Sequence, residues 1–384
     1  MLIIYLVFLL SIFLLMHSFI FYPISIWVLN KFFKKKIRAK KTYYKISILV
    51  SVFNEEKVIE KTIRQLLKSN YPSDKMEIII GSDNSQDSTN NILADLSKEY
   101  SNIKVHNFNI RRGKAKVLND LFEYAKGEIL IFCDANTLYF PDAIEKMVQL
   151  YADNQVGGVS GKLILTEPDK IKSASQEKTY WDAETWLKEQ EGKLGILIGA
   201  NGGIYSIRRE YFEKIPTDRP VMDDFFISLK VLEKGKSFLF TPDAVAQENT
   251  VNLRAEFNRK IRNNSIMMST IKVIKNLLKP SFGLVAYGLW SHKIIRWFTP
   301  VLLFLLLISN FALAKESLFF EYFLIIQLLF YASSVAGFLL YKLKIHVTPF
   351  LMSFYFVMTN LAMFIGLLKF LFKKQTAFWQ STPR

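Results

Sequence analysis

Hydrophobic residues gather in long runs at both ends of the chain and in short runs between them. Residues 1–29 are almost wholly apolar, which is enough to cross about 30 Å of hydrocarbon, and the basic stretch KFFKKKIRAKK (31–41) follows them. No charged region precedes this run and no small-residue cleavage site follows it, so the pattern predicts an uncleaved membrane anchor. The lysines favour a cytosolic location for the part of the chain that comes next.

The C-terminal part returns to apolar runs separated by short polar breaks. We predict membrane segments at 297–313, 318–340 and 350–368, and an interfacial helix at 277–290. One anchor and three later spans would place the basic tail KKQTAFWQSTPR (373–384) outside, against the tendency of lysines to stay in the cytosol. Either one of these segments is re-entrant or lies in the interface, or the charge rule fails here, and the sequence leaves these alternatives open.

Between these ends, short apolar runs alternate with segments whose apolar residues recur at helical spacing. The predicted strands are 46–53, 77–83, 103–108, 129–133, 156–165, 204–207 and 238–241. The predicted helices are 55–69, 87–99, 115–125, 170–190 and 225–233. This alternation predicts an α/β fold with a doubly wound, mostly parallel sheet.

Composition and charge support a membrane protein. The chain has 384 residues, and 51% of them are hydrophobic, which is too apolar for an ordinary soluble enzyme of this size. Lys and Arg outnumber Asp and Glu by 50 to 34, and their clustering beside the apolar runs favours a membrane surface over nucleic acid as the partner. The one cysteine, Cys133, excludes a disulfide framework within the chain, and the scattered histidines make a zinc enzyme a poor fit.

Acidic residues stand where the predicted strands end. Asp83 ends the second strand, and Asp134 and Asn136 follow the fourth. In open α/β sheets, ligands bind beyond the carboxyl ends of the strands, so these side chains are expected at a binding site. Asp223 and Asp224 open a predicted helix, where the alternative to a chemical role is a plain helix N-cap.

Carboxylates at these positions suit a diphosphate held through a divalent cation. Mg²⁺ or Mn²⁺ usually takes one or two carboxylates from protein, and phosphate oxygens and water complete the shell. Arg111, Arg112 and Lys114 surround Gly113 and would meet the remaining phosphate charge. The alternative is that Gly113 and Lys114 form only a turn and a helix start, because the full phosphate-loop motif is missing.

Six sequence pieces, in order, carry a resemblance to a known family. They are SVFNEEKVIEKTI (51–63), SDNSQDST (82–89), RRGKAKVLN (111–119), FCDAN (132–136), GANGGIYSIRRE (199–210) and MDDFFISLKVLEKG (222–235). From residue 46 to about residue 264, the chain resembles family 2 glycosyltransferases with the GT-A fold, including the membrane-bound synthases of cellulose, hyaluronan and poly-N-acetylglucosamine. The resemblance implies three parts: an anchor and basic linker (1–41), a cytosolic GT-A glycosyltransferase domain (42–265), and an interfacial helix, about three membrane segments and a basic tail (266–384).

The resemblance also implies site residues. The family's nucleoside contacts correspond to Asn54, Glu55 and Asp83. Its Asp-x-Asp motif corresponds to Asp134, as the metal ligand, and to Asn136, which replaces the second acid and would bond the donor. Its Glu-Asp motif corresponds to Asp223 and Asp224, which makes Asp224 the catalytic base.

Two further patches fit donor or acceptor binding. Arg259 and Arg262 stand where the processive synthases have Gln-x-x-Arg-Trp, but the Gln and Trp are missing, so a basic helix face at the membrane surface remains the alternative. The loop with Gly199, Asn201 and Gly202 would let an acceptor approach the backbone closely.

For several residues, the sequence favours a structural role over a role in binding or catalysis. Trp181, Trp186 and Tyr205 are more simply core residues than sugar-stacking platforms, and Cys133 is more simply strand packing than a reactive thiol. Arg296 and Trp297 repeat part of the synthase motif by letter, but their place before an apolar run favours a membrane-interface anchor.

The resemblance implies a multi-pass, metal-dependent, inverting glycosyltransferase of the bacterial inner membrane, with its catalytic domain in the cytosol. It would use Mg²⁺ or Mn²⁺, a nucleotide sugar such as a UDP-sugar, and a glycan or lipid-linked acceptor in polysaccharide synthesis, with membrane lipids and an export or polymer-modifying protein as further partners. One alternative is transfer of a single sugar to a polyprenyl phosphate carrier. Another is a non-catalytic membrane receptor that binds a nucleotide sugar.

Overall fold

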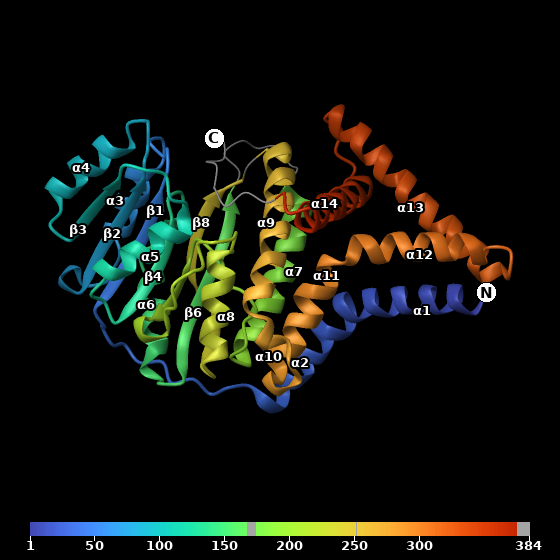
Figure 1. Cartoon of the computed structure of the whole chain (residues 1–384), viewed down its shortest axis with the longest axis horizontal. Coiled ribbons are helices and arrows are strands. Elements are labelled where there is room, and N and C mark those ends of the chain that lie inside the picture. Colours follow the sequence, from blue (N-terminus) through green and yellow to red (C-terminus); the bar gives the residue numbers. More distant parts are fainter. Residues whose placement is uncertain (167–173, 251, 375–384) are drawn as a thin grey trace.

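A mixed β-sheet with helices on both faces forms the globular part of the computed structural model, and apolar helices project from one end of it (Figure 1). The structure describes residues 1–166, 174–250 and 252–374, without the side chains of residues 174–181. In this part of the chain, eight strands form one sheet in the order β3-β2-β1-β4-β7-β6-β8-β5. The strands are β1 (Ile46–Val52), β2 (Met76–Asp83), β3 (Ile103–Phe108), β4 (Ile129–Asp134), β5 (Leu138–Tyr139), β6 (Val156–Thr166), β7 (Tyr205–Arg208) and β8 (Ser237–Asn249).

The first half of the sheet has the predicted parallel, doubly wound arrangement. Strand β1 pairs in parallel with both β2 and β4, and β2 pairs in parallel with β3. The second half is mixed, because β7 runs antiparallel to both β4 and β6. The predicted α/β fold with a mostly parallel sheet is confirmed. The direction of β7 did not emerge from the sequence, because a strand of four residues, three of them buried, does not indicate direction.

Strand β4 is buried on both faces, as its unbroken apolar run predicts. Ile131 and Cys133 pack in the core under α3 (Ile59–Leu67), α4 (Thr89–Glu99) and α6 (Ala143–Val148). Leu130 and Phe132 point to the opposite face, where α5 (Lys114–Tyr124) and α8 (Asp223–Glu233) cover the sheet. Alternate residues of a strand point to opposite faces, so the whole run must be apolar. Cys133 is therefore a packing residue, as expected.

Helices α7 (Ala174–Lys193) and α9 (Leu253–Val273) connect the sheet to the apolar helices (Figure 1). The start of the predicted helix 170–190 lies outside the described residues. The apolar helices are α1 (Leu2–Met16), α2 (Tyr22–Phe33), α10 (Leu284–Gly288), α11 (Ile295–Trp297), α12 (Thr299–Leu313), α13 (Leu318–Lys342) and α14 (Thr348–Leu371). A π-helical turn joins α1 to α2 (His17–Phe21), and another joins α10 to α11 (Leu289–Ile294).

Three of the described helical stretches are long and apolar enough to cross a membrane: Leu2–Phe33, Leu318–Lys342 and Thr348–Leu371. Leu284–Trp297 and Thr299–Leu313 together reach the same length and composition, but they are bent by 61°. Helices α1, α12 and α13 extend away from the sheet, and the start of α1 lies near the α12–α13 connection (Figure 1). The ring of Phe8 contacts that of Phe320 there, at 5.2 Å between centroids.

Helix α14 packs along α9, unlike α1, α12 and α13, which extend away from the sheet. Asn264 of α9 donates a hydrogen bond to the Met363 carbonyl at 2.7 Å. Near the end of α14, the Lys272 ammonium lies 4.5 Å from the centre of the Phe370 ring. The C-terminal end of α14 therefore lies beside the globular part rather than beside the start of α1, which bears on the open question of the basic tail.

We predict that Lys373 lies on the same side of the membrane as the globular domain, and Lys315 on the opposite side. Single cysteines at Lys373, Lys315 and the exposed Lys61 would be introduced into a Cys133→Ala background and probed in sealed vesicles with an impermeant maleimide. Lys373→Cys should label together with Lys61→Cys. Labelling of Lys373→Cys together with Lys315→Cys would contradict the prediction.

A buried ionic cluster joins α7 to the apolar helices. The two ring nitrogens of His292 lie 2.6 Å from Glu191 Oε1 and 2.8 Å from Glu184 Oε1. Arg296 donates to Glu184 at 2.9 Å, and Tyr22 of α2 donates to Glu191 at 2.6 Å. Burial opposes ionisation, but His292 and Lys293 hold the pKa of Glu184 well below its usual range. The cluster ties three separate stretches of the chain together.

We expect His292→Ala to destabilise the fold, because it leaves two buried carboxylates without their shared partner. Breaking a buried charge pair costs about 3–5 kcal/mol. The measurement is the midpoint of thermal unfolding in detergent, with tryptophan fluorescence as the signal. His346→Ala, at an exposed position between α13 and α14, is the matched control and should leave the midpoint unchanged. Equal midpoints for both variants would show that the cluster does not stabilise the junction.

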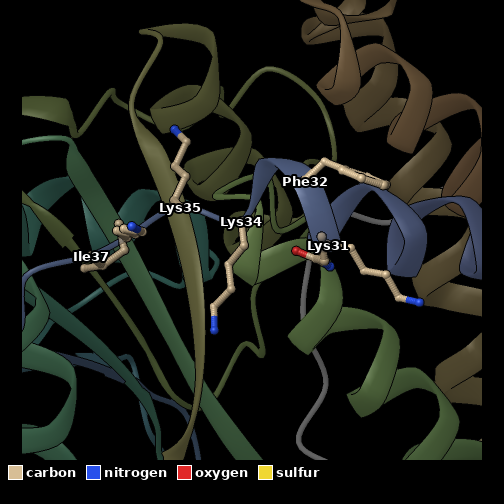
Figure 2. A pocket seen from close by; sticks show the side chains of 7 residues that line it. Lys31, Phe32, Lys34, Lys35 and Ile37 are labelled. Carbon is tan, nitrogen blue, oxygen red and sulfur yellow. The ribbon is translucent and has the colours of Figure 1, made fainter.

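The basic linker after α2 lines an open hollow of about 590 Å³ with four lysines (Figure 2). Lys35 points away from Lys34 and donates to Ser237 at the start of β8, which fixes the linker to the globular part. Strand β8 runs in the same direction as β4, so the start of β8 and the end of β4 lie at opposite ends of the strands in the sheet. The hollow is therefore separate from the acidic residues, and its lysines suit the anionic surface of a membrane.

Candidate active site

The structure brings together acids that are distant in the sequence. Asp134 ends β4, and Asp223 and Asp224 form the first turn of α8. The Lys114 ammonium, from the start of α5, lies 2.7 Å from Asp134 Oδ1 and 2.9 Å from Asp223 Oδ2. Burial works against the charged lysine, but the two carboxylates raise its pKa. These four residues form what we call the acid–lysine cluster.

Gly202 lies between two carboxylates of this cluster. A Cβ atom at residue 202 would come within 2.9 Å of Asp224 Oδ2 and 3.8 Å of Asp134 Oδ2. A side chain at residue 202 would therefore push into the space that the two carboxylates share. Gly199, in the same loop, has φ +95°, a left-handed conformation that favours glycine. The loop thus approaches the acids without a side chain at residue 202, and the expected approach of an acceptor to its backbone stays a prediction.

Asp224 has the properties of a general base. Burial, and then the neighbouring charge of Asp223, raise the pKa of Asp224 to about 7. The N-cap of α8 is Met222, so neither aspartate occupies the N-cap position itself. Within the first turn of the helix, Asp224 Oδ1 accepts a hydrogen bond from the Phe225 N–H at 2.7 Å. A carboxylate with a pKa near neutrality is suited to accept a proton at physiological pH.

The two arginines of α9 point to different partners. Arg259 is held by Glu256, at 2.7 Å from Nε to Oε2. Burial and the neighbouring Arg259 lower the pKa of Arg262, whereas the charges of Asp134 and Asp223 act in the opposite direction. Arg262 is therefore within electrostatic reach of two acids of the cluster, and its role toward a phosphate stays a prediction.

The residues expected to contact a nucleoside lie together beyond β1 and β2. Asn54 has φ +53°, and its side-chain oxygen accepts a hydrogen bond from the Gln86 N–H at 2.8 Å. Glu55 is buried, and its N–H donates to Thr89. Asp83 accepts from the N–H groups of Arg112 and Gly113, at 2.6 and 2.8 Å. These contacts shape the rim of the site, and their nucleoside roles remain predictions.

The two asparagines expected at the site differ in their surroundings. The Asn201 side chain is held inside the protein, since it accepts from Lys188 Nζ at 2.5 Å and donates to the Gly161 carbonyl at 2.7 Å. Its contacts indicate that it positions the loop. Asn136 is half-exposed in the turn after β4, where a donor would reach it.

A divalent cation fits this set of residues when a diphosphate supplies the other ligands. No group of three or more His, Cys, Asp or Glu side chains forms a ready metal site within the described residues. Asp134 offers carboxylate oxygens at the end of β4, and Mg²⁺ or Mn²⁺ commonly binds through one such group together with substrate phosphates. Asp134 would therefore hold the ion.

Sequence reasoning underestimated Arg296 and Trp297. Trp297 is buried and its ring meets that of Phe225, the neighbour of Asp224, edge to face at 6.0 Å. Arg296 pairs with Glu184, so the membrane-interface anchor was the wrong interpretation for both side chains. The repeated Arg-Trp letters were the signal that could have identified them.

The ionic cluster of Glu184, Glu191 and His292, and the buried Lys188, were also missed, because no local pattern marks a charge that is buried by a distant segment. Among the aromatic residues, Tyr205 is in the core, as expected, where it stacks on Phe132. Trp186 is 40% exposed, so the core interpretation is wrong for it. The Trp181 side chain lies outside the described residues.

Comparison with known proteins identifies the globular part. Residues 47–216 match the model of the family described as "Glycosyl transferase family 2". Those residues form a family 2 glycosyltransferase domain. The domain contains Asp134, Lys114 and the 199–203 loop, whereas Asp223 and Asp224 follow just after the matched range.

Two relatives and one solved structure are similar to the chain. The beta-monoglucosyldiacylglycerol synthase of Trichormus variabilis is 29% identical over 227 residues, which cover 56% of this chain and 47% of that one. The poly-beta-1,6-N-acetyl-D-glucosamine synthase of Staphylococcus epidermidis is 27% identical over 211 residues, half of each chain. The chain spans about half the length of these relatives. The mannosyltransferase PcManGT from Pyrobaculum calidifontis, solved with GDP-Man and Mn²⁺, has the same fold, with a TM-score of 0.74 and 21% identity over 96% of this chain and 100% of that one.

If Asp224 is the base of the glycosyltransferase domain, kcat/KM should rise with pH through about 7 and level off above it. The sign follows from the raised pKa: below 7 the carboxyl is mostly protonated and cannot accept a proton. The measurement is nucleoside diphosphate release at pH values on both sides of 7. An acid limb near the ordinary aspartate pKa, about 4, would contradict the assignment.

Proposed function

We propose that the protein is a membrane-bound, inverting glycosyltransferase that moves a sugar from a nucleotide-sugar donor to a glycan or lipid-linked acceptor. The observation that carries this proposal is the acid–lysine cluster, with Asp224 poised near neutrality beside Asp134 and Lys114. The family 2 domain supports the reaction class. The proposed location is the inner membrane of a bacterium, with the globular domain in the cytosol.

The reaction needs one base and one way to stabilise a leaving diphosphate. The acceptor hydroxyl attacks the anomeric carbon, its proton passes to an Asp224 carboxylate oxygen, and the bond from that carbon to the donor's diphosphate breaks. Attack from the face opposite the leaving group inverts the anomeric centre, so no second nucleophile is required. Gly202 leaves the space beside Asp224 open to the acceptor.

The cluster and its neighbours also match the charge of the leaving group. Asp134 would hold Mg²⁺ or Mn²⁺, which supplies positive charge to the departing nucleoside diphosphate. Lys114 and Arg262 add two cations on the protein side, and Asn136 offers a hydrogen bond at the exposed turn. The Mn²⁺ and GDP-Man of the structurally similar mannosyltransferase support a metal-bound nucleotide sugar, although the donor of this chain is not fixed by fold.

The acceptor is proposed from the membrane helices and the relatives. The relatives' names specify a diacylglycerol glycolipid in one case and a glucosamine polymer in the other. Few apolar helices are available in the described chain to form a polymer channel, which favours one or a few transfers onto a membrane-held acceptor, or export by a partner protein.

The test is turnover of a donor panel by the full chain in detergent. UDP-, GDP- and dTDP-sugars are offered with Mn²⁺ or Mg²⁺ and membrane lipid extract, and nucleoside diphosphate release is measured. Asp224→Asn should lower the rate about 100-fold or more, because it removes the base, and Asp134→Ala should do the same by removing the metal ligand. Asp95→Asn, an exposed acid on α4, is the control and should keep the wild-type rate.

Two results would reject the proposal. Turnover that survives Asp224→Asn would remove the assigned base. Tight binding of a nucleotide sugar, with no release of diphosphate for any donor, would favour a receptor instead.

A further inference from the structure

The acid–lysine cluster holds one carboxylate, that of Asp134, which two different cations would use. Lys114 Nζ contacts Asp134 Oδ1 at 2.7 Å, and Asp134 is the residue that fits a divalent cation. An ammonium at this distance and a divalent cation on the same carboxylate would repel each other strongly, because their separation would be only a few ångströms in a partly buried site. The two cations are therefore competitors for Asp134.

The lysine is built so that its end can change partner while its base stays fixed. Asp83 accepts hydrogen bonds from the N–H groups of Arg112 and Gly113, which anchors the backbone just before Lys114. Gly113 has φ +83°, which turns the chain into the first residue of α5. Beyond this anchor, the lysine side chain is a flexible four-carbon stem that carries a compact charge.

A diphosphate would offer the ammonium new anionic partners. Its charge would attract the cations at this site, and Arg262 is a further cation whose pKa responds to the charges of Asp134 and Asp223. Lys114 could then exchange Asp134 for a phosphate oxygen while it keeps Asp223, its second partner at 2.9 Å. The exchange removes the competing charge from Asp134 at the moment when the phosphate arrives.

We propose that Lys114 makes metal binding conditional on the nucleoside diphosphate: it competes with the divalent cation for Asp134 and yields when a diphosphate binds. Metal and nucleotide then bind cooperatively, and each strengthens the other by the same factor. The competition follows from the acid–lysine cluster alone, whereas the role of the diphosphate rests on the proposed function.

Removal of the lysine charge should allow the divalent cation to bind to Asp134 before any nucleotide is present. In Lys114→Gln, the carboxylates of Asp134, Asp223 and Asp224 would share a small space without the ammonium between them. Gly202 shows how close two of them are, since one Cβ position lies 2.9 Å from Asp224 Oδ2 and 3.8 Å from Asp134 Oδ2. Mutual repulsion between carboxylates favours a bound divalent cation, so Mn²⁺ should bind this variant without any nucleotide.

The experiment is a Mn²⁺ titration of the full chain in detergent, with free Mn²⁺ measured by electron paramagnetic resonance, alone and with saturating UDP or GDP. For the wild type, one of the nucleotides should tighten Mn²⁺ binding about tenfold or more. For Lys114→Gln, Mn²⁺ alone should bind about tenfold more tightly than it does to the wild type, and the nucleotide effect should shrink. Lys114→Arg keeps a positive charge beside Asp134 and should keep Mn²⁺ binding weak in the absence of nucleotide.

Lys116→Gln is the matched control, because Lys116 lies on the same helix but pairs with Asp120, at 3.4 Å, away from the cluster. It should match the wild type. Thermal unfolding checks that each variant is folded. If Lys114→Gln does not fold, Lys114→Met serves as the neutral variant in its place. If Mn²⁺ alone binds the neutral variant no more tightly than the wild type, the competition is overturned. If it binds more tightly but no donor is turned over, the competition stands and the transferase function fails.

Discussion

The site depends on one electrostatic constraint: three carboxylates lie within a small, partly buried space, and one ammonium lies among them. Burial, and then the neighbouring charge of Asp223, raise the pKa of Asp224 to about 7, whereas the carboxylates of Asp134 and Asp223 raise the pKa of Lys114 against its burial. Asp134 and Asp223 both pair with the lysine. The proposed division of roles between metal ligand and base rests on that arrangement.

The rest of the globular part fixes the relative positions of these carboxylates and the lysine. Both faces of strand β4 are buried, which fixes this strand in the sheet. Asp134 is its last residue and therefore lies at the carboxyl end of the strand. Asp83 fixes the turn that delivers Lys114, and the 199–203 loop approaches the acids where a side chain would collide. Each of these contacts comes from a different segment, so the site exists only in the folded sheet.

The apolar helices are linked to the same site through α7. Glu184 and Glu191 bind the His292 segment, and Lys188, between them on the same helix, holds Asn201 of the loop over the acids. Trp297 adds a direct packing contact to Phe225, next to Asp224. The apolar helices thus do more than anchor the domain, because they brace the elements that surround the proposed base.

By itself, the sequence determined the parts that depend on local pattern. Apolar runs bounded by polar residues predicted the strands around β4, and six short pieces in order indicated the family and the candidate acids. Tertiary structure alone decided the direction of β7, the partners of Arg259 and Asn201, and the contacts of Arg296 with Glu184 and of Trp297 with Phe225. The physical reason is that periodicity records whether a residue is buried, whereas the partner of a buried charge is set by segments far away in the chain. The acids and Lys114 could therefore be predicted as site residues, but the pairing of Lys114 with Asp134 and Asp223 could be found only in the fold.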